Sequence, residues 1–152
     1  AMNLYLFGTG TGLAPFMSII QDPYTYEKFE KVVLVHGVRT VSELAYHDFI
    51  TEELPGHELL GELIREKLVY YPLVTREEFR NQGRLTDLIE NGKMAADLGL
   101  QPLNPATDRA MMCGSPSMLV DLCKILDARG FQVSPSQGVP GDYVIERAFV
   151  EK

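Results

Sequence analysis

The sequence predicts an α/β fold, a Rossmann-like three-layer sandwich with a five-stranded, mostly parallel sheet flanked by helices. Three observations predict it. Short apolar runs alternate along the chain with stretches of helical periodicity, as in parallel sheets joined by crossover helices. Turn residues, glycine above all, follow these runs. The length of 152 residues suits one domain, because a chain of this size buries about 70% of its unfolded surface.

The first part of the chain contains two predicted strands and two predicted helices. Residues 3–7 are strand-like, and apolar side chains at helical spacing follow over residues 13–20. A second buried strand over 32–36 precedes Thr40 and Glu43, whose spacing is that of a capping box and predicts a helix start. The buried stripe of that helix is predicted to be Tyr46, Phe49, Ile50 and Leu54.

The middle of the chain adds a helical piece over 59–66 and a third strand over 68–74. Pro72 lies within that strand and suggests that its end is not fully paired, because proline cannot donate to a sheet. Residues 75–100 are polar and contain short helical pieces, such as residues 86–90.

The last third of the chain carries the clearest helix signal. A fourth strand over 110–113 precedes Ser115 and Pro116, which are an N-cap residue and a proline at the first helical position. Gly130 ends this helix, and residues 143–145 are a final strand candidate. The apolar stripe of the helix is Met118, Leu119, Leu122, Ile125 and Leu126.

Unusual residues follow four of the predicted strands. In strand order they are Gly8 to Gly12, Gly37 with Arg39, Thr75 with Arg76, and Cys113 to Pro116. Carboxyl ends of parallel strands meet at one edge of a sheet, where ligands of such folds bind. The sequence therefore predicts one binding site at this edge.

A glycine-rich turn joins the first strand to the first helix. Thr9, Gly10, Thr11 and Gly12 form it; glycines let the backbone approach a phosphate, and the following helix start favours an anion. A purely structural turn is the alternative. The turn does not satisfy G-x-G-x-x-G and no phosphate-loop lysine follows it. Neither an ordinary NAD-fingerprint dehydrogenase nor a nucleoside triphosphatase is therefore supported.

An arginine stands after the second strand, where an NAD-binding protein would offer an acid to the ribose. Arg39 can instead hold a 2′-phosphate. Arg76 and Arg84 could add to that pocket, because the guanidinium fork matches phosphate oxygens. Helix capping or surface salt bridges are the alternative for these residues, above all for Arg80.

Composition excludes several other classes. The formal net charge of −7 argues against nucleic acid and anionic membranes as partners. No stretch approaches the ~20 apolar residues of a membrane span, and no leader peptide is recognisable, so a cytoplasmic protein is expected. Cys113 and Cys123 match no metal-ligand spacing, and the three histidines form no ligand set.

Two further features have open interpretations. Cys113 ends a strand but has no obvious activating partner in the sequence, so covalent nucleophilic catalysis is not expected. Tyr143 and Phe149, close to the C-terminus, either anchor the chain end or cover a planar cofactor.

Together these motifs resemble the C-terminal half of bacterial ferredoxin (flavodoxin)–NADP(+) reductases over essentially the whole chain. Each motif alone is modest evidence, but six of them occur in the same order. The matching segments are residues 9–16, 35–39, 74–77, 83–86, 113–118 and 146–152.

The resemblance implies a role for each part of the site. The turn over residues 9–12 would hold the pyrophosphate and approach the nicotinamide, and Ala148 and Phe149 would lie against FAD. In such enzymes the flavin exchanges hydride with NADP(H) and single electrons with ferredoxin or flavodoxin. The 2′-phosphate side would be bound by Thr75 and Arg39, Arg76 and Arg84. The nicotinamide end would be lined by Gly114, Ser115, Pro116 and Cys113, the last nearest the carbon that exchanges hydride.

The resemblance also predicts the domain organisation. Residues 1–152 would form the NADP(H)-binding domain, with a flavin-facing tail from about residue 142 to residue 152. The family's N-terminal FAD-binding β-barrel, with its R-x-Y-[ST]-type motif, is not found in this sequence, and the Ala-Met start resembles a vector remnant. The isolated chain is therefore expected to bind no FAD tightly. The alternative is a stand-alone NADP-sensing or interaction module, which would need neither the cysteine nor the tail.

Overall fold

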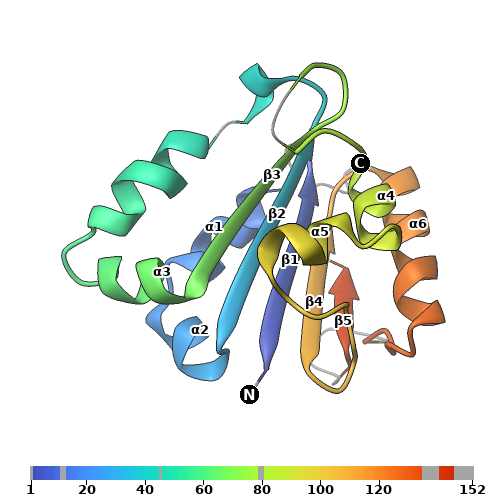
Figure 1. Ribbon diagram of the computed structural model, residues 1–152. Helices are drawn as coiled ribbons and strands as arrows, with labels where there is room; N and C mark the ends of the chain where they lie inside the picture. The colour runs from blue at the N-terminus through green and yellow to red at the C-terminus, as the bar shows by residue number, and fades with distance from the viewer. Residues whose placement is uncertain (1, 11–12, 45, 79–80, 135–140, 146–152) are drawn as a thin grey trace, which may run out of the picture.

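A sheet of parallel strands forms the centre of the fold (Figure 1). The computed structural model describes residues 2–10, 13–44, 46–78, 81–134 and 141–145. Within these residues the sheet has the order β3-β2-β1-β4-β5, and every neighbouring pair is parallel. The strands are β1 (Asn3–Thr9), β2 (Lys31–Val38), β3 (Leu68–Val74), β4 (Asp108–Cys113) and β5 (Tyr143–Ile145). The predicted Rossmann-like sheet is confirmed.

Helices cover both faces of this sheet, so the three predicted layers are present. In Figure 1, α1, α2 and α3 lie on one side of the sheet and α4, α5 and α6 on the other. Their bounds are α1 (Ala14–Ile20), α2 (Pro23–Lys28), α3 (Gly61–Lys67), α4 (Leu85–Glu90), α5 (Lys93–Leu98) and α6 (Pro116–Ala128).

Alternation along β1 explains how one sheet builds two cores. Leu4 and Leu6 belong to the core beneath α1, α2 and α3, whereas Tyr5 and Phe7 belong to the core beneath α4, α5 and α6. All four are buried, as expected for a central strand with both faces covered. Helices therefore cover both faces of the sheet, and a ligand would bind at the carboxyl ends of its strands.

The C-terminal helix is formed as its sequence predicts. The side chain of Ser115 accepts a hydrogen bond from the Met118 amide, and Pro116 begins α6. Gly130 follows the helix with φ of 90°, a left-handed conformation that glycine adopts without strain. Tyr143 in β5 is buried, and its hydroxyl donates to Asp127 Oδ1 at 2.7 Å. Tyr143 thus anchors β5 to the end of α6, while Phe149 lies outside the described residues.

The prediction for residues 40–54 is only partly right. The Thr40–Glu43 capping box is present, but it begins a 3₁₀ helix of three residues, Val41–Glu43. The chain leaves helical geometry at Leu44, where φ is −77° and ψ is 75°, so the predicted continuous helix is wrong. A π-helical turn (Phe49–Glu53) and a 3₁₀ turn (Leu54–Gly56) follow. Tyr46, predicted to be buried, is 37% exposed.

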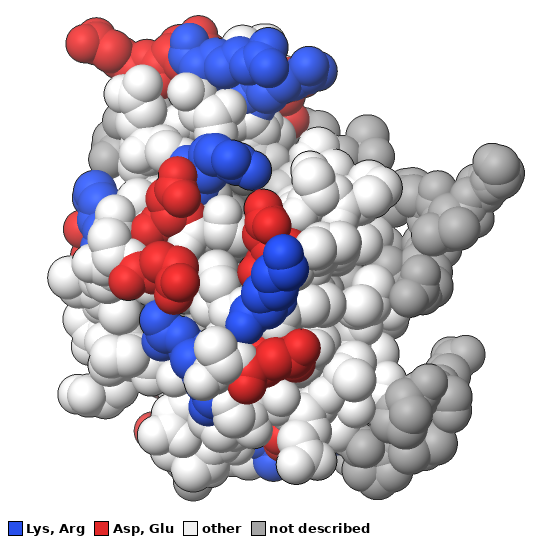
Figure 2. All heavy atoms as spheres, turned by 90° about the vertical axis from the view of Figure 1, so that its right-hand side faces the viewer, with Lys and Arg blue, Asp and Glu red and all other residues white. Residues whose placement is uncertain are grey.

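The surface carries mixed charge on the side of the molecule that faces right in Figure 1. Figure 2 shows acidic and basic side chains interspersed there, with uncharged surface between them. Among the described residues, no helix has the length and apolar character needed to cross a membrane.

Candidate nucleotide-binding site

A cavity of about 500 Å³ lies at the carboxyl edge of the sheet. It is lined by residues that end or follow β1, β2, β3 and β4, as the strand-end motifs predicted. Its size falls in the range of small-molecule sites, roughly 300–1,000 Å³. From the predicted set it includes Thr9, Gly10, Arg39, Thr75, Arg84, Gly114 and Ser115. It also includes Glu43, Thr86 and Ser117, which the sequence did not identify as site residues.

The ends of β1 and β4 approach each other closely at one wall of the cavity. The amide of Ser115 donates to Thr9 Oγ1 at 3.1 Å. A Cβ at Gly114 would overlap Thr9 Oγ1 and would lie 2.8 Å from Met118 Cε. Only glycine fits at this position, because any side chain would push the two strand ends apart. The space in front of these backbones is thereby kept free for a ligand.

The glycine turn is shaped by its contacts with β2. Gly10 has φ of 57°, a left-handed conformation that favours glycine, and its amide donates to the Gly37 carbonyl at 3.1 Å. No atom lies within 4 Å of the place where a Gly10 Cβ would stand, so the turn borders open space. Thr11 and Gly12 lie outside the described residues.

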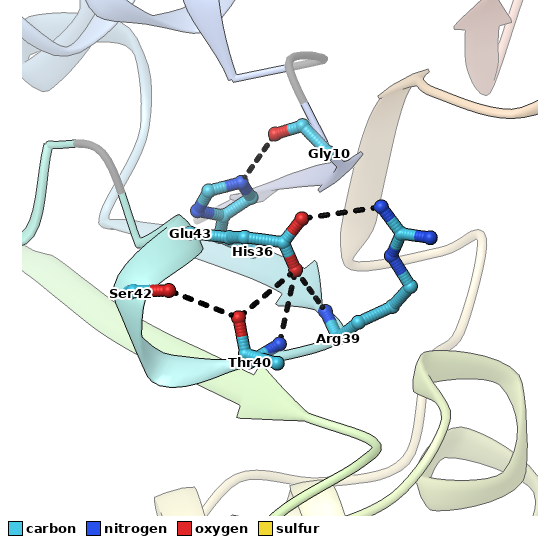
Figure 3. A network of polar contacts seen from close by, with 6 residues as sticks. All are labelled: Gly10, His36, Arg39, Thr40, Ser42 and Glu43. Carbon is cyan, nitrogen blue, oxygen red and sulfur yellow. Dashed lines mark hydrogen bonds and ion pairs between the residues drawn. The ribbon is translucent and has the colours of Figure 1, made fainter.

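A hydrogen bond from the side chain of His36 also holds this turn. Its Nε2 lies 2.8 Å from the Gly10 carbonyl oxygen (Figure 3). A carbonyl can only accept, so Nε2 carries the proton. The ring is fully buried, and its Nδ1 has no hydrogen-bond partner among the described residues. Burial lowers the pKa of His36, and the bond to Gly10 opposes that shift only partly. His36 is therefore a neutral residue that positions the turn.

The segments after β2 and β3 continue side by side beyond the sheet. The Thr75 amide donates to the Val38 carbonyl at 3.0 Å, and the Arg76 amide donates to the Arg39 carbonyl at 2.9 Å. These bonds place the backbones of two predicted phosphate-binding arginines next to each other. The Arg39 side chain is 64% exposed and borders the cavity.

Glu43 adds a carboxylate to this group of cations. Its Oε1 accepts from the amides of Arg39 at 3.1 Å and Thr40 at 3.0 Å, and its Oε2 lies 3.3 Å from an Arg39 guanidinium nitrogen. The Thr40 amide, and then Arg39, hold the pKa of Glu43 below its ordinary value. Across the cavity, Arg84 lies 3.9 Å from Asp121. The cavity therefore holds two arginines, each beside an acid.

Three predicted site residues that the structure describes, Arg76, Cys113 and Pro116, are not part of the cavity lining. Cys113 is 2% exposed and belongs to the core beneath α1. Arg76 and Pro116 are exposed but do not line the cavity. The tail residues Ala148 and Phe149 lie outside the described part of the chain. No group of acidic, histidine and cysteine side chains that could hold a metal ion occurs among the described residues.

A parallel sheet with a glycine turn and arginines at its carboxyl edge defines a nucleotide-binding α/β domain. Residues 6–124 match the family described as "Oxidoreductase NAD-binding domain", and the chain belongs to that family. The family-level resemblance inferred from the motifs is thereby confirmed.

Several proteins are similar to this chain over nearly its whole length. It is 66% identical over 150 residues to a ferredoxin–NADP reductase of Azotobacter vinelandii, covering 99% of this chain and 58% of that protein. It is 47% identical over 148 residues to a flavodoxin/ferredoxin–NADP reductase of Rhodobacter capsulatus, covering 97% and 54%. A crystal structure of a ferredoxin NADP+ reductase from Neisseria gonorrhoeae with bound FAD and NADP aligns with a TM-score of 0.80 and 28% identity, covering 96% and 56%. The chain thus spans a little over half the length of these proteins.

Proposed function

We propose that this chain is the NADP(H)-binding part of a ferredoxin– or flavodoxin–NADP(+) reductase. The observation that carries the proposal is the placing of Arg39 and Arg84 on one cavity with the backbone of Thr9, Gly10 and Gly114. Guanidinium groups bind phosphate oxygens in a planar fork, and glycine backbone permits close approach of a pyrophosphate. A dinucleotide with a 2′-phosphate needs guanidinium groups for that phosphate and a glycine backbone for its pyrophosphate.

The two ends of the cavity take different parts of the cofactor. Arg39 and Arg84, with Thr75 and Arg76 beside them, bind the 2′-phosphate, and the turn over residues 9–12 binds the pyrophosphate. In this proposal the nicotinamide end is formed by Gly114 and Ser115, which line the cavity, with Cys113 and Pro116 next to them in the chain. Because Cys113 is almost fully buried, it supports this end from the core and is not an exposed nucleophile.

A flavin completes the reaction in the longer protein. FAD couples the two-electron exchange with NADP(H) to single-electron transfer with ferredoxin or flavodoxin. In this proposal the flavin is held mainly by sequence outside these 152 residues, with Ala148 and Phe149 of the tail against it. Ferredoxin or flavodoxin is proposed as the partner because the relatives are a ferredoxin–NADP reductase and a flavodoxin/ferredoxin–NADP reductase.

We place the protein in the cytoplasm. Cys113 and Cys123 form no disulfide, which fits a compartment that keeps cysteines reduced. A stand-alone sensing module remains the competing proposal, and the family of oxidoreductases to which the chain belongs favours the enzyme.

Calorimetry with two nucleotides tests the proposed cofactor. Adenosine 2′,5′-bisphosphate (2′-phospho-AMP) and AMP differ only in the 2′-phosphate. The chain should bind the bisphosphate at least about tenfold more tightly, since a phosphate hydrogen-bonded to charged groups contributes about 1.5–3 kcal/mol. Equal affinities for the two nucleotides would reject a 2′-phosphate site.

A further inference from the structure

The carboxylate of Glu43 is paired with the guanidinium of Arg39, one of the two arginines that line the cavity. Figure 3 shows its two oxygens between the Arg39 guanidinium and the amides of Arg39 and Thr40. One oxygen accepts from both amides, and the other pairs with the guanidinium at 3.3 Å. Glu43 lines the same cavity as the arginine and keeps 39% of its side chain exposed. The Glu43 carboxylate is thus held beside the Arg39 guanidinium, the group proposed to bind the phosphate.

This arrangement is unfavourable for a phosphate at Arg39. The bound phosphate would bring negative charge within a few ångströms of the carboxylate, and like charges at such distances repel. The guanidinium would also have to share its donors between two anions or leave Glu43. The carboxylate itself is an acceptor suited to ribose hydroxyls, the use that NAD-binding proteins make of an acid after the second strand.

We propose that Glu43 is a specificity-determining residue whose carboxylate competes with the 2′-phosphate for Arg39 and so limits the preference for NADP(H) over NAD(H). The proposal rests on the proposed function, because it takes the 2′-phosphate to bind at Arg39. The proposal goes beyond that function because it names a residue, Glu43, that opposes binding of the 2′-phosphate. Removing the Glu43 charge should increase the preference for nucleotides that carry a 2′-phosphate.

Helix capping alone would also explain why a glutamate stands here. Glu43 is the last residue of the capping box with Thr40. Glutamine keeps an oxygen that can accept from the Arg39 and Thr40 amides, and it replaces the charged oxygen beside the Arg39 guanidinium with an NH2 group that cannot accept. Glu43→Gln therefore separates the two roles, since capping is retained while competition for Arg39 is removed.

Glu77→Gln is a matched control. Glu77 Oε1 accepts from the amide of Val41 at 2.6 Å, so it too bonds the backbone of the short helix that contains Glu43. It does not line the cavity. Glu77→Gln removes one negative charge near Glu43 and leaves the Arg39–Glu43 pair in place. It therefore measures how much the loss of any nearby charge changes nucleotide affinity.

The experiment is calorimetry of the chain and its variants with 2′-phospho-AMP and with AMP at low ionic strength. Glu43→Gln should bind 2′-phospho-AMP about 3- to 30-fold more tightly, as expected for removal of a partly screened like charge. AMP affinity should change less than about twofold in this variant, and Glu77→Gln should change both affinities by less than about twofold. In an Arg39→Ala background the gain from Glu43→Gln should shrink, because the contested group is gone.

Three results would overturn the proposal: an unchanged or weaker affinity of Glu43→Gln for 2′-phospho-AMP, an equal gain with Glu77→Gln, or an equal gain in the Arg39→Ala background. If the unmodified chain binds 2′-phospho-AMP and AMP equally, the proposed function fails, and this inference fails with it. A clear preference in the unmodified chain that Glu43→Gln leaves unaltered rejects the inference alone.

Discussion

His36 and Gly10, which lie 26 residues apart in the sequence, are joined by a hydrogen bond of 2.8 Å from the imidazole Nε2 to the carbonyl oxygen. The bond links the turn after β1 to a residue near the carboxyl end of β2, in addition to the parallel pairing of the two strands. It holds the backbone that borders the cavity, and Nε2 can donate it from either protonation state of the fully buried ring. Burial, and not this bond, disfavours the protonated form of His36.

Stability should fall as the pH falls through about 6.5, the ordinary histidine pKa. Because burial lowers the pKa of His36 in the folded chain, the unfolded chain takes up the proton first. The free energy of unfolding is then fully retained above that pH and declines below it. Urea midpoints measured between about pH 5 and pH 8 should show this decline, and His36→Gln, which can still donate to Gly10, should show less of it.

His47→Gln is the matched control for this prediction. The His47 side chain is 32% exposed, so His47→Gln removes one histidine of the chain without removing a buried ring. Identical slopes for the parent chain and His36→Gln would show that His36 does not cause the decline.

Gly114→Ala should destabilise the fold and weaken nucleotide binding. The added methyl group would overlap Thr9 Oγ1 and crowd Met118 Cε and the Thr9 amide, at 2.8 and 3.1 Å. Overpacking of this kind costs about 1–3 kcal/mol. Urea unfolding measures the loss. Gly56→Ala should change stability by less than about 0.5 kcal/mol, because nothing lies within 4 Å of its Cβ position.

A second substitution tests the cause of that loss. Thr9→Ala removes the Oγ1 atom that the new methyl group would meet, so the double variant should recover part of the stability lost by Gly114→Ala. The recovery would be incomplete, since Thr9 Oγ1 also accepts from the Ser115 amide. Strictly additive losses would place the strain elsewhere.

Strong periodic patterns in the sequence predicted most of the fold. The strand over 68–74 and the start of α6 at Ser115 and Pro116 were predicted to the residue. Of the three six-residue helices α2, α4 and α5, the sequence predicted α4, over residues 86–90, but not the other two, since so short a helix gives little periodic signal. Gly92 and Gly99, both left-handed, flank α5 and are a local signal for its two ends.

The site was predicted less completely than the fold. Strand-end logic brought Thr9, Arg39 and Gly114 to one cavity, because parallel strands share an edge. Glu43 was read only as a helix cap. A capping box is a local pattern, and it does not reveal that the same carboxylate also reaches the Arg39 guanidinium. The early end of the helix at Leu44 and the exposure of Tyr46 likewise depend on tertiary structure.

The isolated 152-residue chain should carry no stoichiometric flavin and should not reduce artificial acceptors with NADPH. In the proposed function FAD is bound mainly by sequence outside this chain, so NADP(H) would bind without a partner for the hydride. Absorbance at flavin wavelengths after purification and a diaphorase assay measure both. A yellow, catalytically active chain would contradict the proposed division of labour. A longer protein that contains this sequence should regain both properties if the enzyme proposal is correct, and neither if it is a sensing module.

Arg39→Ala and Arg84→Ala should each weaken NADP⁺ binding by about 1.5–3 kcal/mol, the contribution of hydrogen bonds to a charged group. NAD⁺ binding should change far less, since NAD⁺ lacks the 2′-phosphate. Arg76→Ala tests whether an exposed arginine beside the cavity, whose amide donates to the Arg39 carbonyl, also reaches the phosphate. Calorimetry with both cofactors gives the comparison.

Arg65→Ala is the control for a general loss of positive charge. Arg65 lies in the last turn of α3 and does not line the cavity, so its removal should leave the preference for NADP⁺ intact.

The Glu43 carboxylate should make the losses of affinity in Arg39→Ala and Arg84→Ala unequal. With Glu43 present, Arg39 is already paired with a carboxylate at 3.3 Å, so part of its attraction for the phosphate is lost to that pair. Arg39→Ala should therefore cost less than Arg84→Ala, because Arg84 lies farther, 3.9 Å, from the carboxylate of Asp121. Equal losses for NADP⁺ and NAD⁺ in any of these variants would remove that arginine from the 2′-phosphate site.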